Sequence, residues 1–235
     1  MKLTTVLFDL DGTLLPMDQE MFVKYYLGLL SKKLAPLGYD PKTLVSGIWA
    51  GTGAMVKNDG SCSNEEVFWK KFSTFFDQDV RKDEPVFHHF YENEFSGAKA
   101  ACSFNPKAAE TIHTLKERGL RLVLATNPIF PAVATENRIR WAGLEPSNFE
   151  LYTTYENSCR CKPNPDYYRD ILAQIGVDPT DCLMVGNDAL EDTAAEKLGI
   201  KVFLLTDCLI NRDGRDVSAY PQGSFDELLG YISSL

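Results

Sequence analysis

Two spacings of apolar residues divide this chain into two kinds of segment. From about residue 105 onward, short apolar runs of strand length alternate with amphipathic stretches that have the period of a helix. An earlier apolar run, residues 4–10, predicts a buried strand near the N-terminus. The later pattern predicts strands at 120–127, 150–155, 182–188 and 201–206, the last being the final strand, and helices at 106–118, 131–142, 165–175, 189–198 and 225–235.

The ends of these predicted helices carry residues that start and stop helices. Asn105 precedes Pro106, and Gly119 follows the helix, which suits an N-cap, a first turn and a C-terminal stop. Ser224 with Glu227 three positions later has the pattern of a capping box. Repeated alternation of strand and helix predicts an α/β fold, with a Rossmann-like parallel sheet and helices on both of its faces.

Residues 17–103 break this alternation, because their apolar positions have helical spacing only. Ser63 and Glu66 supply a second capping-box pattern at the start of one such stretch. The helices predicted in this region are 19–34, 64–76 and 83–95. We therefore expect an α-helical cap domain at residues 17–103, inserted into a core domain that comprises residues 1–16 and 104–235.

The interior of the expected cap contains several glycines at 47–60, and we expect this stretch to be a flexible loop. A single G-x-G pattern there is too common to indicate a nucleotide site. The aromatic residues of the cap helices, Trp49 and Trp69 among them, are expected to pack in its hydrophobic core.

Composition adds limits on partners and on the cellular compartment. The formal net charge of −9 disfavours attraction to nucleic acid or to an anionic membrane. No apolar run approaches the ~18 residues of a membrane span, and the N-terminus lacks the pattern of a signal peptide. The six cysteines are scattered, so we expect a reduced, cytoplasmic protein without a disulfide framework. The oligomeric state is left open, with a monomer as the working expectation.

The N-terminal strand ends in two carboxylates, Asp9 and Asp11, which are two positions apart. Side chains at positions i and i+2 of an extended chain share a face, so the two negative charges come close together. Like charges at short range are unfavourable unless something neutralises them. The acidic pair therefore predicts a nearby lysine or metal ion.

Three further strand ends, or the loops that follow them, carry polar residues. Thr126 and Asn127 end one strand, Lys162 lies before a helix, and Gly186 opens a cluster of acidic and amide residues. Because the carboxyl ends of parallel strands meet at one edge of the sheet, we expect these groups to converge with the acidic pair. A nucleophile, hydrogen-bond donors and a cation are the groups that phosphoryl transfer requires.

A resemblance to a known family rests on four short stretches, DLDGT, ATN, CKPNP and GNDALED. In this order and spacing they are similar to the sequence motifs of the haloacid dehalogenase superfamily. The motifs span residues 9–192, and the helical insertion after the first motif resembles the α-helical type of cap in that family. Most members are Mg²⁺-dependent phosphatases that form an aspartyl-phosphate. The resemblance therefore implies a phosphatase that acts on a small phosphorylated metabolite.

The resemblance also implies a role for each matching residue. Asp9 would be the nucleophile that attacks phosphorus, and Asp11 would be the general acid and base. Thr126, with Asn127 and the nearby backbone, would hydrogen-bond the phosphoryl oxygens. Lys162 would neutralise the charge of the phosphoryl group and of the carboxylates. The all-oxygen set of ligands suits Mg²⁺, with Asp9 and the backbone carbonyl of Asp11 among them.

The chain departs from the family pattern at one metal position. The residue after Gly186, usually an aspartate that binds the metal, is Asn187, and Asp188 follows it. Adjacent side chains on extended backbone point in opposite directions, so Asn187, which stands at the usual ligand position, is favoured as the direct metal ligand. Mg²⁺ prefers anionic oxygen, however, and this preference favours Asp188 as the ligand. We favour Asn187 as the direct ligand, with Asp188 supplying negative charge nearby. Asp192 is left open between binding the metal and a structural role, such as fixing Lys162 or capping its helix.

Three other functions are weighed against phosphatase activity. A phosphomutase of the same superfamily would use the same motifs, and the sequence does not separate the two. A haloacid dehalogenase works without Mg²⁺ and typically lacks the second aspartate, so Asp11 argues against it. A non-catalytic binding protein would be expected to have lost a motif residue, whereas Asp9, Asp11 and Lys162 are all present.

Overall fold

The computed structural model describes residues 2–235, in which six parallel strands form one sheet. The strands are β1 Thr5–Phe8, β2 Arg121–Leu124, β3 Leu151–Tyr152, β4 Cys182–Gly186, β5 Lys201–Leu205 and β6 Gln222–Gly223. Their order across the sheet is β3-β2-β1-β4-β5-β6. The N-terminal strand thus lies between β2 and β4, and the carboxyl ends of these three strands are neighbours. The expected parallel α/β fold is confirmed.

Successive residues of β1, β2, β4 and β5 face two different hydrophobic cores, as the period of a β-strand requires. Val6 and Phe8 of β1 pack in one core with helices α5, α6 and α8, and Leu7 packs in the other with α7 and the 3₁₀ helix η6. These helices are α5 Pro106–Glu117, α6 Ala132–Trp141, α7 Pro165–Ile175, η6 Thr193–Leu198 and α8 Phe225–Ser233, with short 3₁₀ turns η4 Pro146–Asn148 and η5 Pro179–Asp181. Helices therefore cover both faces of the sheet.

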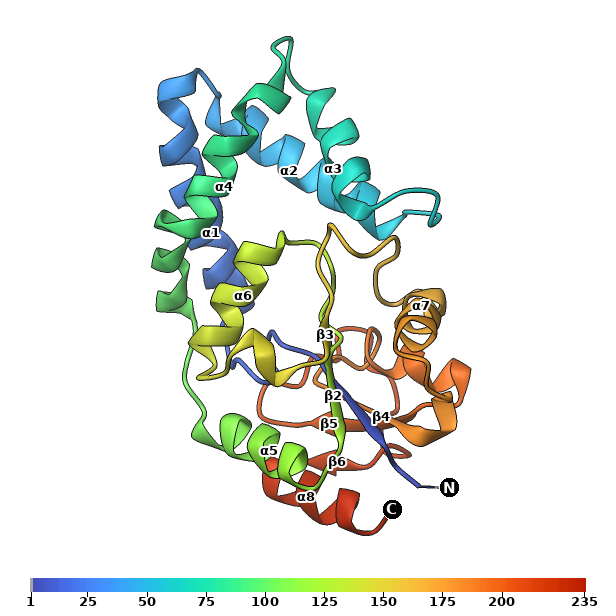
Figure 1. Ribbon diagram of the computed structural model, residues 1–235. Coiled ribbons are helices and arrows are strands. Elements are labelled where there is room, and N and C mark those ends of the chain that lie inside the picture. The colour runs from blue at the N-terminus through green and yellow to red at the C-terminus, as the bar shows by residue number, and fades with distance from the viewer. Residues whose placement is uncertain (1) are drawn as a thin grey trace.

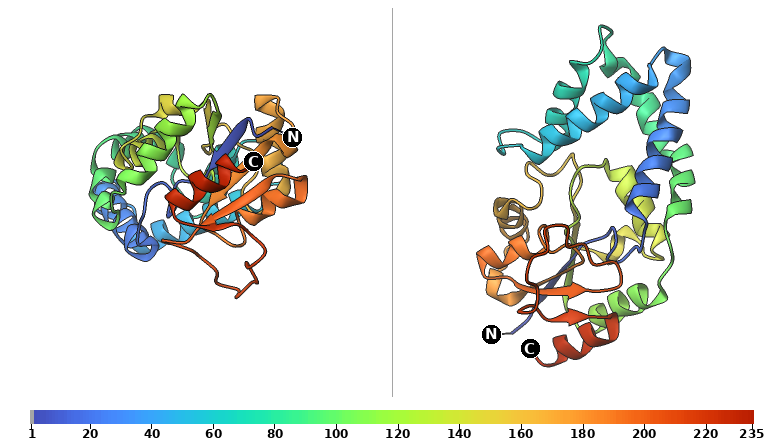
Figure 2. Two further views of the ribbon diagram at one scale, coloured as in Figure 1. Left: turned by 90° about the horizontal axis from the view of Figure 1, so that it is seen from below. Right: turned by 180° about the vertical axis from the view of Figure 1, so that it is seen from behind.

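Helices occupy most of the chain between β1 and α5, and they arch over one end of the core (Figure 1). They are α1 Gln19–Leu34, α2 Pro41–Val56, α3 Asn64–Ser73 and α4 Glu84–Glu92, with 3₁₀ helices η1 Ala35–Leu37, η2 Val80–Asp83 and η3 Glu94–Ala101. Both chain termini lie at the opposite end of the molecule (Figures 1 and 2). The helical pattern predicted for this region is confirmed, whereas the exact boundaries of the cap domain stay a prediction.

The helical region is attached to the core at several places, one of which is the Asn137 amide of α6, which donates to the Tyr91 carbonyl of α4 (2.8 Å). Its entry and exit segments pair with each other, since the Ser103 N–H donates to the Pro16 carbonyl (2.8 Å). At the other side, the side chain of the fully buried Asn64 donates to the Pro128 carbonyl (3.1 Å). The Asn64 N–H also donates to the Ser158 carbonyl (2.8 Å). The start of α3 is therefore bound to loops of the core.

The prediction of a loop at 47–60 is wrong over most of its length, because α2 continues to Val56. Asp40 caps the start of this helix by accepting from the Thr43 N–H (2.9 Å), and Pro41 occupies the first position. Both are standard helix-start residues. The glycines that follow conceal this helix in the sequence, because glycine has a low helix propensity.

Gly47 and Gly51 serve close packing of α2 against α3. A Cβ added to Gly47 would lie 3.1 Å from the Phe72 ring, and one added to Gly51 would lie 2.6 Å from the Phe68 ring. The burial of the two phenylalanines against the helix offsets the propensity cost of about 1 kcal/mol per glycine. This compensation depends on a second helix and is invisible in the local sequence.

Two further expectations at the C-terminal half need correction. The helix expected at 189–198 is only the 3₁₀ helix η6, because residues 187–192 form a turn in which Asp188 accepts backbone N–H groups. The strand at β5 is not the last, since β6 pairs with it through Gln222 and Gly223. The strand β6 has only two residues and no apolar run, so the sequence offers no pattern from which it could be predicted.

Candidate active site at the carboxyl ends of the strands

The carboxyl ends of β1, β2 and β4 bring the predicted site residues to one edge of the sheet. Asp9 directly follows β1, and its N–H donates to the Val185 carbonyl of β4 (2.9 Å). Thr126 lies just beyond β2, and Asn187 directly follows β4. All three residues are buried. In an open parallel sheet, this is the place where a crevice for a ligand forms.

Lys162 is a buried cation of the kind that the acidic pair predicts. Its Nζ donates to Asp9 Oδ1 (2.9 Å) and to Asp192 Oδ1 (2.7 Å). Burial disfavours the charged amine, but the two carboxylates outweigh burial and hold the pKa of Lys162 well above its usual value. Burial raises the pKa of Asp9 and that of Asp192, against the effect of the lysine. In this geometry Asp192 holds the amine of Lys162 against Asp9.

Asp11 is paired with a second buried cation, Arg138 of α6, which sequence reasoning missed. The Nη1 of Arg138 donates to Asp11 Oδ2, and its guanidinium lies 4.4 Å from the centre of the Phe130 ring. The arginine is only 1% exposed. In the sequence it stands between Glu136 and Arg140, which are not buried, so no local signal marks it. Burial raises the pKa of Asp11 despite this pairing.

Thr126 and Asn127 line the cavity from the end of β2. The Thr126 carbonyl accepts from Thr153 Oγ1 (2.6 Å) and from the Tyr167 hydroxyl (2.8 Å), which fixes the backbone at this point. The Asn127 amide donates to both carboxylate oxygens of Glu191, at 3.1 Å each. Burial raises the pKa of Glu191 to about 8. Glu191 belongs to the GNDALED stretch, and its place in that acidic cluster is the signal that could have identified it.

Gly12 and Thr13 fix the position of Asn187. Thr13 Oγ1 lies 3.1 Å from Asp9 Oδ2 and 2.9 Å from Asn187 Oδ1. The Asn187 amide donates to the Cys208 carbonyl (2.7 Å), which turns its oxygen toward Thr13. Gly12 has a φ of +85°, and a Cβ added there would lie 2.3 Å from the Asn187 amide nitrogen. Only glycine therefore fits at this position of the DLDGT stretch.

Asp188 is placed differently from Asn187. Its Oδ1 accepts from the N–H groups of Leu190 (2.8 Å) and Glu191 (2.9 Å), so it caps the turn after β4. Its own N–H donates to Asp192 Oδ2 (2.8 Å). The turn is tight, because a Cβ added to Gly186 would lie 2.0 Å from the same Asp192 oxygen. Asp188 still lines the cavity, but one of its oxygens is committed to the backbone.

The oxygen atoms at this edge fit a divalent cation. A hydroxyl has one proton, so Thr13 can donate to Asp9 Oδ2 or to Asn187 Oδ1 but not to both. Asp11 Oδ1 is buried without a hydrogen-bond partner. Carboxylates outnumber the two buried cations here, and Mg²⁺ prefers oxygen ligands. Residues 2–235 hold no group of three His, Cys, Asp or Glu side chains placed for a metal.

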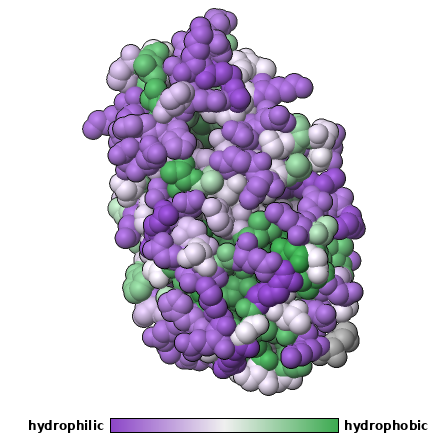
Figure 3. All heavy atoms as spheres, in the orientation of Figure 1, coloured by the Kyte–Doolittle hydropathy of each residue, from purple (hydrophilic) through white to green (hydrophobic). Residues whose placement is uncertain are grey.

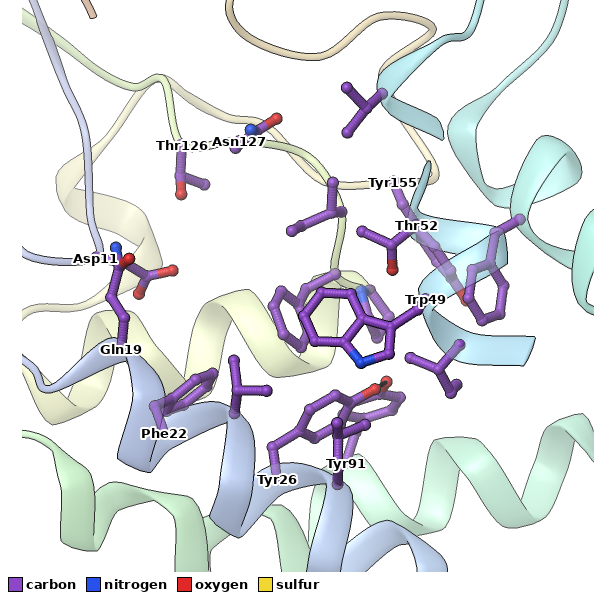
Figure 4. Close-up of a pocket in the computed structure, with 18 of the residues that line it drawn as sticks. Asp11, Gln19, Phe22, Tyr26, Trp49, Thr52, Tyr91, Thr126, Asn127 and Tyr155 are labelled. Atoms are coloured by element: carbon purple, nitrogen blue, oxygen red, sulfur yellow. Dashed lines mark hydrogen bonds between the residues drawn. The ribbon is translucent and has the colours of Figure 1, made fainter. Parts of the chain in front are cut away.

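A cavity of about 1000 Å³ lies between these residues and the helices α1 to α4. Asp11, Thr126 and Asn127 lie along one side of it, and Trp49 of α2 points into it (Figure 4). The expectation that Trp49 packs in the cap core is wrong, because its side chain is 53% exposed, whereas Trp69 is buried as expected. Over helices α1 to α4 the outer surface is mostly hydrophilic, with hydrophobic residues visible in a hollow (Figure 3).

Comparisons with known proteins give the family and the fold of this chain. The family model described as haloacid dehalogenase-like hydrolase matches residues 3–199. A phosphoglycolate phosphatase from Colwellia psychrerythraea is 26% identical over 232 residues, which cover 98% of this chain and 96% of that protein. A pyrophosphatase from Bacillus pumilus is 25% identical over 85% of this chain and 81% of its own length. The crystal structure of a HAD phosphatase from Thermococcus onnurineus has the same fold, with a TM-score of 0.59 at 20% identity and 97% coverage of both chains.

Proposed function

This chain belongs to the haloacid dehalogenase-like hydrolases, and from this premise we propose that it is a phosphatase acting on a small phosphorylated metabolite. The observation that best supports the proposal is the buried Lys162, which is held between Asp9 and Asp192. It sets a nucleophilic carboxylate beside a positive charge at the base of a cavity that has room for an organic phosphate. The relatives named phosphoglycolate phosphatase and pyrophosphatase support the same class of reaction.

In the first step of the proposed mechanism, a carboxylate oxygen of Asp9 attacks phosphorus. The bond between phosphorus and the alcohol oxygen breaks, and Asp11 gives its proton to that leaving oxygen. The positive charge of Lys162 and hydrogen bonds from Thr126 and Asn127 offset the negative charge on the phosphoryl oxygens. The product of this step is the free alcohol and a phosphoryl group on Asp9.

In the second step, Asp11 takes a proton from water and the resulting hydroxide attacks the same phosphorus atom. The bond between phosphorus and the Asp9 oxygen breaks, which releases inorganic phosphate and restores the carboxylate. Asp11 ends the cycle with its proton again. Arg138, whose Nη1 donates to Asp11 Oδ2, would keep the carboxyl group in one orientation during both transfers.

We further propose Mg²⁺ as the cofactor, held by Asp9, the backbone carbonyl of Asp11 and Asn187. When bound, the ion would offset negative charge on the phosphoryl group. The turn that engages Asp188 supports Asn187 as the direct ligand, with Asp188 contributing charge nearby.

We also propose that residues 17–103 act as a cap that closes over the substrate, with residues 1–16 and 104–235 as the core. The net charge of −9 supports a small-molecule partner and not nucleic acid or a membrane surface. None of the helices within residues 2–235 has the length and apolar character to cross a bilayer. All six cysteines are unpaired, which supports a reduced, cytoplasmic compartment, and a monomer remains our working proposal.

The function is tested with p-nitrophenyl phosphate and with phosphorylated metabolites, in Mg²⁺ and in EDTA. We expect hydrolysis that depends on Mg²⁺, because the carboxylate-rich site needs a cation to accept a phosphoryl dianion. Free inorganic phosphate should accumulate in step with the alcohol. A phosphoryl group that is returned to another hydroxyl of the same substrate would indicate a mutase instead, and no turnover in Mg²⁺ would contradict the proposal.

Substitutions at Asn187 and Asp188 test the proposed metal ligands. Asn187→Ala and Asp188→Ala are both expected to raise the Mg²⁺ concentration that gives half of the maximal rate, since each removes an oxygen or a charge near the ion. Asn187→Asp is expected to lower it, because a carboxylate replaces a neutral amide. An exposed aspartate on α8, changed in Asp226→Ala, is the control and should leave the value unchanged. Unchanged Mg²⁺ dependence in both alanine variants would contradict the assignment.

A further inference from the structure

Aromatic side chains line the part of the cavity beyond the proposed phosphoryl site. They include Phe22, Tyr26, Trp49, Phe68, Tyr91 and Tyr155. The cavity volume of about 1000 Å³ is at the upper end of the range for pockets that bind drug-sized molecules. A two-carbon acid esterified to phosphate would leave most of this volume unfilled. A ligand with an aromatic ring would remove apolar surface of the cavity wall, and of the ring itself, from water.

Helix α2 places Trp49 on the cavity wall. Trp49, Thr52 and Val56 are three and four positions apart, so they share one face of the helix, and all three line the cavity. Gly47 and Gly51, on another face, pack against α3 and hold the helix in place. The Trp49 side chain points into the cavity and remains 53% exposed (Figure 4). An indole in this setting offers ring surface to a ligand.

Tyr26 of α1 and Tyr91 of α4 add a fixed aromatic wall. Their ring centroids are 6.2 Å apart with an angle of 23° between the rings. Their hydroxyl groups bond each other at 2.8 Å, and both residues are buried. Because one hydroxyl donates to the other, only one hydroxyl proton of the pair stays free, and the rest of this wall is ring surface.

The charges around the cavity disfavour a second anionic group on the ligand. Five glutamates line it, Glu20, Glu65, Glu84, Glu156 and Glu191. Among the described residues of the lining, Arg212 is the only arginine or lysine, and it is exposed. Burial, together with the neighbouring Glu156 and Glu84, raises the pKa of Glu65. A carboxylate on the ligand would meet this negative potential, whereas a cationic ring would be attracted by it.

Resting on the proposed phosphatase function, we propose that the substrate is a phosphate monoester whose alcohol carries a planar aromatic ring, neutral or cationic, and no second anionic group. The ring would lie against Trp49, with the phosphoryl group at Asp9. Stacking of a flat ring on an aromatic side chain typically changes binding by about 5- to 150-fold. The proposal thus separates this chain from a phosphoglycolate phosphatase, whose named substrate carries a carboxylate.

Esters of primary alcohols test the proposal, because their leaving groups are chemically matched. We expect kcat/KM for phenethyl phosphate to exceed that for butyl phosphate by at least about 5-fold. The pyridinium analogue of phenethyl phosphate should be at least as good, and phosphoglycolate should be the poorest. In Trp49→Ala the ratio of kcat/KM for phenethyl phosphate to kcat/KM for butyl phosphate should fall toward one. Trp49→Phe should retain most of the preference for the phenethyl ester. Phe104→Ala, which removes an aromatic ring that is 60% exposed outside the cavity lining, is the control and should keep the ratio.

The inference and the proposed function fail in different ways. No hydrolysis of any ester would contradict the function, whereas hydrolysis without preference for the aromatic ester, or a ratio unchanged in Trp49→Ala, would overturn the inference. Calorimetric binding of phenethyl and butyl phosphonates, which cannot be hydrolysed, makes the same comparison without turnover. Tighter binding of the phenethyl compound supports the inference, and equal affinities overturn it even if the protein hydrolyses nothing.

Discussion

The Asp9→Asn variant is expected to lose at least about 10⁴-fold in kcat while it remains folded. An amide is a poor nucleophile, so the proposed attack on phosphorus is blocked. Asparagine has nearly the same shape as aspartate, and its oxygen can still accept from Lys162 while its amide donates to Thr13. The loss of rate would therefore come from the missing nucleophile and not from unfolding.

Single-turnover experiments followed by mass spectrometry measure this effect. The wild-type protein should carry a transient phosphoryl adduct on the peptide that contains Asp9, and the variant should not. Thermal unfolding should be nearly unchanged, and Asp216→Asn, which alters an exposed aspartate of a surface loop, should retain full activity. Rapid turnover by purified Asp9→Asn, or an adduct on another residue, would show that Asp9 is not the nucleophile.

The Lys162→Met variant is expected to lose both activity and stability. Methionine keeps the volume of the side chain but leaves the buried carboxylates of Asp9 and Asp192 without their counterion. Removal of one partner from a buried ion pair typically costs about 3–5 kcal/mol of unfolding free energy. Urea unfolding in EDTA should therefore show a much lower midpoint than that of the wild type.

Two comparison variants separate the general effect of losing a lysine from the effect of leaving buried carboxylates unpaired. Lys107→Met removes an exposed lysine that pairs with Glu110 and Asp226, and it should change stability far less than Lys162→Met does. The double variant Lys162→Met with Asp192→Asn should recover part of the lost stability, because one unpaired charge is removed, but none of the activity. Equal destabilisation by Lys162→Met and Lys107→Met would contradict the buried ion-pair assignment.

Local sequence signals predicted most of the elements. Asn105 caps α5 through the Lys107 N–H, and Ser224 with Glu227 forms the predicted capping box of α8. Such signals act within one helical turn, so they are readable without knowledge of the rest of the fold. The helix α2 was missed because its glycines are unfavourable locally, and only packing against α3 offsets that cost.

The site was predictable where the parallel sheet alone determines proximity. Asp9, Thr126 and Asn187 follow neighbouring strands, so the strand order is sufficient to bring them together. The partners that depend on helices and turns were not predictable. Arg138 reaches Asp11 across 127 positions of the chain, and its helix shows no pattern that distinguishes it from an exposed arginine.

The sequence by itself therefore determined the α/β class, the helical insertion and the residues of the acidic, hydroxyl and lysine motifs, because periodicity, capping and motif spacing are local properties. The tertiary structure alone decided that Arg138 is buried beside Asp11, that Asp192 holds Lys162, and that Trp49 faces the cavity. These depend on which distant surfaces meet. Burial and the pairing of charges arise only when elements far apart in the chain pack together, and it is this packing that gives the cavity its aromatic and acidic lining.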